Sequence, residues 1–152
     1  NGAHLAEVVI DPDTGVVTTD RYTVVDDFGN LINPMLAEGQ VHGGVVQGIG
    51  QAVQEHVVYD EEGQLLTATF MDYALPRAAD VPHISFTSEP VPSTANVMGM
   101  KGCGEAGTVG ALAAIANAVQ DALWEQGVRQ ADMPFTPHRV WEMLQGDQIA
   151  AE

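Results

Sequence analysis

The chain has 152 residues and a formal net charge of −16 at pH 7, from 21 acidic and 5 basic side chains. Such an acidic surface repels phosphate groups, which disfavours nucleic-acid binding and attachment to anionic membranes through basic residues. One cysteine allows no internal disulfide and fits a reducing compartment, and no apolar run approaches the roughly 20 residues of a membrane-spanning helix. We therefore predict a cytoplasmic protein that neither binds nucleic acid nor spans a membrane.

The first predicted unit is a β-hairpin. Residues 5–10 and 16–25 alternate in β-forming residues, and the turn Asp11-Pro-Asp-Thr-Gly15 joins them. Asp26 and Asp27 follow the second strand, beside a glycine and an asparagine. Paired aspartates in that setting are typical of side-chain turns; a metal site or an acid/base couple is the alternative.

A long helix is predicted from Asn33-Pro34, an N-cap followed by proline at the first helical position, to about Val58. Each interior glycine costs about 0.5–1 kcal/mol relative to alanine. Close approach of another backbone or of a ligand must compensate, and the sequence leaves both possibilities open. The segment contains five glycines: Gly39, Gly43, Gly44, Gly48 and Gly50.

The same helix is rich in glutamine. The spacing predicts one shared face, where amides could donate to and accept from a polar ligand; a solvated face is the alternative. His42 and His56 have no metal-ligand spacing with a cysteine or acidic residue. The glutamines are Gln40, Gln47, Gln51 and Gln54.

Three further elements are predicted: a hairpin, a strand and a short helix. Residues 57–70 read as a second hairpin around Gly63, and residues 82–88 as a strand. Thr136 and Pro137 begin a short helix that ends before Gly146, with Val140, Trp141 and Leu144 expected to pack inward. Residues 147–152 are expected to form a frayed tail.

The segment of residues 98–108 is the strongest candidate for a functional loop. It contains the only lysine (Lys101), the only cysteine (Cys103) and four of the sixteen glycines, and it leads into a predicted helix that ends near Gly127. Glycine lets the backbone approach a ligand closely. A bulky ligand is therefore expected here.

Glu105 stands where this loop becomes the helix. A helix N-terminus favours an ionised carboxylate, whereas burial raises the pKa of a carboxyl group. A glutamate under both influences can serve as a general base; the alternative is a glutamate that only stabilises its helix. Residues 102–107 also match Gly-x-Gly-x-x-Gly, but no strand leads into them, which disfavours a dinucleotide-binding fold.

These elements predict a mixed α+β fold, with hairpins and a sheet packed against helices. Residues 1–146 are expected to form one unit and residues 147–152 its tail. The chain begins with Asn1 instead of methionine, with almost no residues before the first predicted strand. We therefore expect it to be a fragment of a longer chain.

Three motifs resemble those of one known family in order and spacing. They are the run from Asp27 to Gln51, which includes Gly-Gln-Val-His-Gly-Gly; Phe70-Met-Asp-Tyr-Ala-Leu-Pro76; and Lys101-Gly-Cys-Gly-Glu-Ala-Gly107. The chain closely resembles the C-terminal part of the molybdopterin-binding subunit of the xanthine oxidase family of molybdenum hydroxylases. Within this family it is most similar to the branch of carbon monoxide dehydrogenase large chains. The resemblance implies the aldehyde oxidase/xanthine dehydrogenase type of domain.

The resemblance also implies residue roles. Glu105 corresponds to the family's catalytic base, which deprotonates a metal-bound hydroxyl that attacks an electron-poor carbon. Gln40 corresponds to a glutamine that binds the pterin, and Cys103 and Gly104 fall where the backbone touches the cofactor. No residue of this chain is implied as a direct metal ligand. Cys103 is not the copper-binding cysteine of carbon monoxide oxidisers, which lies upstream, so the resemblance gives no basis for copper.

The implied cofactor is molybdenum with molybdopterin, as its cytosine dinucleotide. The implied partners are the rest of the large subunit, subunits or domains that carry [2Fe-2S] and FAD, and a small-molecule substrate such as an aldehyde, an N-heterocycle or a CO-like molecule. The isolated fragment is expected to be inactive. The alternative function is a non-catalytic binding or assembly module that keeps the fold.

Overall fold

A computed structural model describes residues 1–146. The predicted tail, residues 147–152, lies outside the described residues. Strands β1 (Gly2–Ile10) and β2 (Val17–Asp26) pair in antiparallel fashion, with a register shift between Glu7 and Val8. The first predicted hairpin is therefore confirmed.

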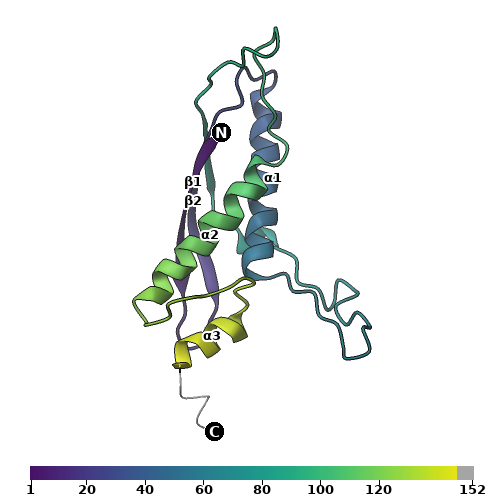
Figure 1. Cartoon of the computed structure of the whole chain (residues 1–152), viewed down its shortest axis with the longest axis vertical. Coiled ribbons are helices and arrows are strands. Elements are labelled where there is room, and N and C mark those ends of the chain that lie inside the picture. The colour runs from purple at the N-terminus through teal and green to yellow at the C-terminus, as the bar shows by residue number, and fades with distance from the viewer. Residues whose placement is uncertain (147–152) are drawn as a thin grey trace.

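Strand β3 (Ile84–Ser88) completes a sheet of order β1-β2-β3 and runs parallel to β2 (Figure 1). The strand itself was predicted; its parallel pairing was not. A parallel pair needs a long crossover connection, and helix α1 (Pro34–Val53) lies within it. The predicted α+β class is confirmed.

Helix α1 begins as predicted, because the Asn33 side chain accepts a hydrogen bond of 3.2 Å from the Leu36 backbone N–H. It ends at Val53, earlier than the predicted Val58. The backbone N–H groups of Gln54 and Glu55 both donate to the Gly50 carbonyl, at 2.9 and 2.8 Å. This shared acceptor closes the last turn and ends the regular i to i−4 pattern.

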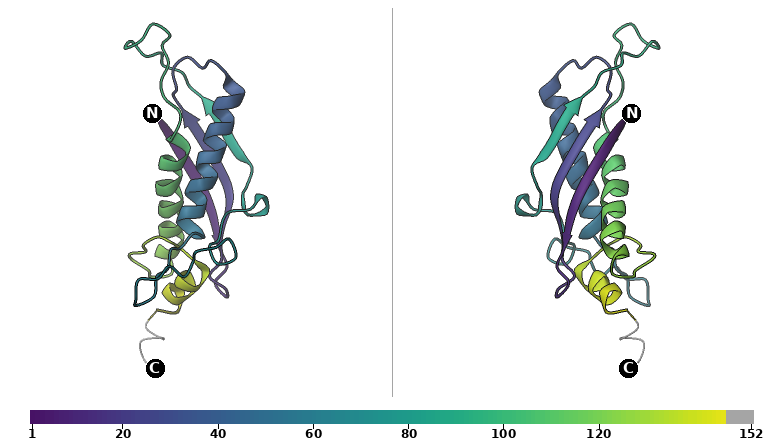
Figure 2. Two further views of the ribbon diagram at one scale, coloured as in Figure 1. Left: turned by 90° about the vertical axis from the view of Figure 1, so that its right-hand side faces the viewer. Right: turned by 90° about the vertical axis from the view of Figure 1, so that its left-hand side faces the viewer.

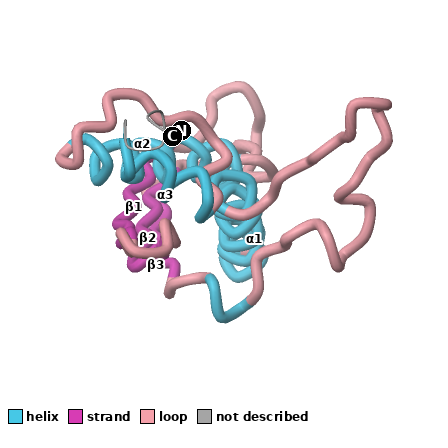
Figure 3. Tube along the Cα trace, turned by 90° about the horizontal axis from the view of Figure 1, so that it is seen from below, coloured by secondary structure: helices cyan, strands magenta, loops and turns pink. Residues whose placement is uncertain are grey.

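Helix α2 (Ala106–Trp124) packs against α1, and both helices lie on the same side of the sheet (Figures 2 and 3). The contact explains part of the glycine content. A Cβ atom on Gly44 would lie 2.8 Å from the Thr108 nitrogen, and one on Gly107 would lie 2.4 Å from the Val41 carbonyl oxygen. These glycines allow two helix backbones to approach closely.

The core lies between the sheet and the two helices. Alternate strand residues point into it, and the opposite face of the sheet exposes Leu5 (63%) and Val9 (58%). Fully buried side chains from β2, α1 and α2 include Tyr22, Val24, Val41, Val45, Ile49, Ile115, Val119 and Leu123.

The second predicted hairpin, residues 57–70, is wrong. Tyr59 and Leu65 form only an isolated bridge within a segment that extends away from the rest of the molecule (Figure 1). A two-stranded hairpin without a packing layer is marginal in water, and Val57 and Leu66 remain about half exposed.

Helix α3 (Pro137–Gln145) begins after Thr136 and is followed by Gly146, as predicted. Val140 is fully buried and Leu144 packs partly against the core. Trp141 does not pack inward, contrary to the prediction; it is 37% exposed, and its Cβ lies beside the turn between β1 and β2. A Cβ on Gly15 in that turn would come within 2.9 Å of the Trp141 Cβ.

Candidate cofactor site

The glycine-rich loop lies against the connection between β2 and α1. The Lys101 backbone N–H donates to the Phe28 carbonyl at 2.9 Å, and the Asn30 N–H donates to the Gly99 carbonyl at 3.0 Å. Two segments about 70 residues apart in the sequence are thereby joined at the end of the molecule where α1 begins (Figure 1).

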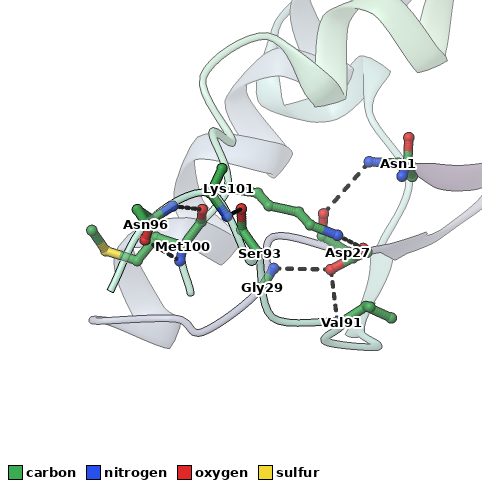
Figure 4. A network of polar contacts seen from close by, with 9 residues as sticks. Asn1, Asp27, Gly29, Val91, Ser93, Asn96, Met100 and Lys101 are labelled. Carbon is green, nitrogen blue, oxygen red and sulfur yellow. Dashed lines mark hydrogen bonds and ion pairs between the residues drawn. The ribbon is translucent and has the colours of Figure 1, made fainter. Parts of the chain in front are cut away.

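Asp27 provides the polar centre of this junction (Figure 4). Its Oδ1 accepts hydrogen bonds of 2.9 Å from the backbone N–H groups of Gly29 and Val91, and its Oδ2 forms an ion pair with the Lys101 ammonium group. Lys101, followed by the Val91 and Gly29 N–H groups, lowers the pKa of the Asp27 carboxyl below its ordinary value. The contact with Gly29 is the predicted side-chain turn.

Asp26 behaves differently from its neighbour, so the turn prediction is wrong for this residue. It is 3% exposed, and its Oδ1 lies 3.6 Å from Nε2 of His4. The Tyr22 hydroxyl lies 2.9 Å from Nδ1 of the same histidine. Burial, and secondarily Asp26, raises the pKa of Tyr22. The Asp26 side chain therefore belongs to a polar cluster with His4 and Tyr22 and does not form a side-chain turn.

A cavity of about 500 Å³ lies beside the loop junction. It brings together three of the four predicted site residues, Gln40, Cys103 and Gly104. Gln40 Nε2 donates a hydrogen bond of 2.8 Å to the Gly104 carbonyl, which fixes the start of α1 to the end of the loop. Phe28, Leu36 and Met100 contribute apolar parts of the wall.

The fourth predicted residue, Glu105, is the N-cap of α2, as the sequence indicated. Its backbone carbonyl accepts from the Val109 N–H at 3.0 Å, but its carboxylate makes no capping hydrogen bond. The side chain is exposed in this chain and does not line the cavity, although its neighbour Gly104 does. The burial expected to act on Glu105 is thus not provided by residues 1–146.

The predicted glutamine face is only partly present. Gln47 accepts from the Thr108 hydroxyl at 3.3 Å, and Gln47 and Gln51 line a second cavity of about 430 Å³. Gln54 is the C-cap residue of α1 and lines neither cavity. Gln40 is therefore the one glutamine of the four that lines the cavity beside the glycine loop.

Comparison with known proteins identifies the family. A family model described as a molybdopterin cofactor-binding domain matches residues 1–82, which is more than half of the chain. The chain belongs to the molybdopterin cofactor-binding domain family. The predicted resemblance is thereby confirmed.

Members of known function are similar over nearly the whole chain. The carbon monoxide dehydrogenase large chain of Hydrogenophaga pseudoflava is 40% identical over 98% of this chain, which covers 19% of that relative. The 6-hydroxypseudooxynicotine dehydrogenase complex subunit gamma of Paenarthrobacter nicotinovorans is 41% identical over 95% of this chain and 18% of its own length. The chain spans about a fifth of the length of these relatives.

The structural comparison agrees with the sequence comparison. The crystal structure of quinoline 2-oxidoreductase from Pseudomonas putida 86 matches 96% of this chain with a TM-score of 0.93 and 42% identity, over 19% of that protein. The fold of residues 1–146 is therefore that of part of a molybdopterin-binding protein.

The cavity beside Gln40 fits a pterin. Its volume of about 500 Å³ falls in the range of small-molecule sites, roughly 300–1,000 Å³. Asn30, Asn33 and Gln40 line it. Each amide makes one hydrogen bond within the chain, with Met98, Leu36 and Gly104 respectively, and the remaining amide atoms can donate to or accept from the polar edge of a pterin. A Cβ on Gly102 or Gly104 would meet nothing within 4 Å among the described residues, so space for close backbone approach exists.

Sequence reasoning missed the partners that shape the loop. Asp27 and Lys101 each begin one of the family motifs, but nothing in their spacing indicated that they pair. The available signal was the single lysine in a very acidic chain. Within residues 1–146, no three His, Cys, Asp or Glu side chains gather as a metal site. None of the helices in this range has the length and hydrophobicity of a membrane span.

Proposed function

We propose that this chain forms part of the cofactor site of a molybdenum hydroxylase, with Glu105 as the general base. The observation that carries the proposal is the hydrogen bond from Gln40 to the Gly104 carbonyl. It joins the predicted pterin-binding residue to the residue next to the predicted base, across 64 positions of sequence.

In this proposal, the chain contributes two functions to a larger site. Gln40 and the backbone at Cys103 and Gly104 bind the edge of the pterin, and Asn30 and Asn33 add hydrogen-bonding groups. When bound, the molybdenum cofactor supplies the water-derived oxygen and accepts the electrons of substrate oxidation. Glu105 removes a proton from the oxygen nucleophile as that oxygen attacks an electron-poor carbon.

Glu105 lies at the N-terminus of helix α2, as its N-cap residue. The unpaired N–H groups and the positive end of the helix dipole favour a negative charge at this position. Its exposure in this chain leaves the carboxylate accessible to a cofactor and to a substrate held by other parts of the protein. The catalytic pocket is therefore completed outside residues 1–146, and the isolated chain is expected to be inactive.

The substrate class is an electron-poor carbon in an aldehyde, an N-heterocycle or a CO-like molecule. The names of similar proteins include quinoline, nicotine and carbon monoxide. The proposal therefore covers all three kinds of substrate. We extend the proposal to the cytosine dinucleotide form of the cofactor, to partner subunits or domains with [2Fe-2S] and FAD, and to a cytoplasmic location. Relatives named as a large chain and as a subunit of a complex support an assembly of several subunits.

The decisive variant is Glu105→Gln in the complete, cofactor-loaded protein. It removes the basic oxygen and keeps the size of the side chain, so kcat should fall by about 100-fold or more, the usual contribution of a general base. Glu125→Gln is the matched control, because it makes the same change at the exposed C-cap of the same helix. A Glu105→Gln protein with normal kcat and normal molybdenum content would exclude Glu105 as the base.

The alternative is a non-catalytic binding or assembly module with the same fold. Metal and pterin analysis of the purified complete protein separates the two functions. A hydroxylase copurifies with molybdenum and a pterin dinucleotide, whereas an assembly module carries neither.

A further inference from the structure

The ion pair between Lys101 and Asp27 differs from the other ion pairs formed by lysine or arginine in residues 1–146. It connects positions 74 residues apart, and its side chains are only 28% and 13% exposed. By contrast, Arg21 and Glu7 are 73% and 54% exposed and 4.0 Å apart. Exposed pairs of that kind contribute little to stability, whereas sheltered pairs are screened less by water and salt.

The Asp27 carboxylate joins its own loop to two separate points of the connection between β3 and α2 (Figure 4). It accepts from the Gly29 N–H in its own loop, from the Val91 N–H after β3, and from the Lys101 ammonium group in the glycine-rich loop. Hydrogen bonds to a charged acceptor are about twice as strong as neutral ones. This single side chain therefore holds the β2–α1 loop against both ends of the β3–α2 connection.

The backbone at this junction allows little freedom. Gly29 has a φ of 61°, and a Cβ there would lie 2.1 Å from the Gly99 carbonyl oxygen. The backbones of these two loops are therefore in direct contact. The Lys101 N–H bond to the Phe28 carbonyl lies next to this contact. Lys101 is thus held by both its backbone and its side chain.

Residues 102–105, which follow Lys101, make few hydrogen bonds with the rest of the described chain. Only Gly102, Cys103 and Gly104 separate Lys101 from Glu105. Neither glycine offers a side chain to pack, and the Glu105 carboxylate makes no capping hydrogen bond. Cys103 packs partly against the hydrophobic core. The polar contacts of the segment lie at its two ends, which are the Lys101 junction and the bond from Gln40 to Gly104.

We infer that Lys101, held by Asp27, is a positioning residue that sets the path of residues 101–105 and so presents the Gly104 carbonyl and the Glu105 carboxylate to the cofactor. The catalytic consequence rests on the proposed function. The structural part concerns the loop alone and is tested separately.

The test compares Lys101→Met with Lys101→Arg in the complete, cofactor-loaded protein, using hydrogen exchange and steady-state kinetics. Loss of the cation should speed amide exchange in residues 99–105 by roughly tenfold, the effect of losing one hydrogen bond to a charged group. In the same variant kcat should fall while KM stays near the original value, because the base is displaced and the rest of the substrate site is kept. Lys101→Arg keeps the charge and should restore most of both properties.

Three further variants make the result specific. Asp27→Asn should also speed exchange in residues 99–105, and its effect should add less than fully to that of Lys101→Met, because both remove the same ion pair. Arg21→Met removes the cation of the exposed pair and should change neither property. Glu105→Gln should lower kcat without changing exchange.

The outcomes separate the two proposals. Unchanged exchange in Lys101→Met would overturn the positioning role, whatever the activity of the variant. Faster exchange in Lys101→Met with an undiminished kcat would overturn the role of Lys101 in presenting Glu105. An undiminished kcat in Glu105→Gln would instead overturn the proposed function and leave the control of the loop by Lys101 in place.

Discussion

Glycines are concentrated in two regions of this chain and have a different structural role in each. Where α1 meets α2, a Cβ on Gly44, Gly48 or Gly107 would come within 2.8 Å of an atom of the other helix. At the candidate cofactor site, a Cβ on Gly102 or Gly104 would meet nothing within 4 Å, and the same holds for Gly43 on the exposed side of α1. The first group is required by packing within the chain, whereas the second is not.

The difference shows that glycine content alone does not identify a ligand site. Gly107 belongs to the same sequence motif as Gly102 and Gly104, yet it packs against α1. A functional role is supported only for glycines that the chain itself does not need. Substitution by alanine at both kinds of position tests this distinction directly.

Gly107→Ala should have the largest effect on folding. The new Cβ would lie 2.4 Å from the Val41 carbonyl oxygen and 2.9 Å from the Val45 nitrogen, both of which are backbone atoms. Overpacking of this kind costs about 1–3 kcal/mol. Urea unfolding of the chain should therefore show a lower midpoint; an unchanged midpoint would mean that the two helices separate at no cost.

Gly43→Ala should act in the opposite direction. This glycine is exposed within α1, and its Cβ would meet nothing within 4 Å. Alanine at a compatible helical position stabilises by about 0.4–1 kcal/mol, mainly because the unfolded chain loses freedom. The same unfolding measurement should give a higher midpoint, and a decrease would show that the space beside Gly43 is needed in the folded chain.

Gly104→Ala should leave the stability of the chain within about 0.5 kcal/mol of the original, as expected for a site without packing contacts. Its effect should appear in the cofactor instead. In the complete protein, a methyl group facing the cavity would obstruct the pterin and lower the molybdenum content. Full molybdenum content in this variant would contradict close approach of the cofactor to Gly104.

Asp27 gives the smallest expected effect, and that effect depends on pH. Because its folded-state pKa lies below the ordinary value, which is about 3.9, its stabilising contribution is fully present above about pH 4 and is lost as the pH falls further. Asp27→Asn removes this titration. Its stability should therefore decline less between pH 5 and pH 3 than that of the unmodified chain, and parallel declines would contradict the pKa shift.

Much of the fold could be predicted from local patterns. The hairpin before Asp26, the N-cap at Asn33 and the position of Glu105 at the start of α2 follow from turn, capping and periodicity rules, and the structure agrees. The prediction of a hairpin over residues 57–70 was wrong, because the alternation of apolar and polar residues does not reveal whether another part of the chain packs against the apolar face. The parallel pairing of β3 with β2 depends on the whole crossover connection.

The candidate site was predictable in its residues but not in its construction. The family resemblance selected Gln40, Cys103 and Gly104, and the structure places all three around one cavity. The ion pair of Asp27 with Lys101 could not be predicted, because it depends on how two distant loops meet. The exposure of Glu105 could not be predicted either, because it depends on the tertiary packing of residues 1–146 around the start of α2.

The most direct test of the central claim is an experimental structure of the complete protein with its cofactor bound. The account predicts that the pterin lies in hydrogen-bonding contact with the Gln40 amide and that the Glu105 carboxylate faces the metal and the substrate space. A cofactor bound elsewhere, or a Glu105 carboxylate directed into bulk solvent away from the metal, would contradict it.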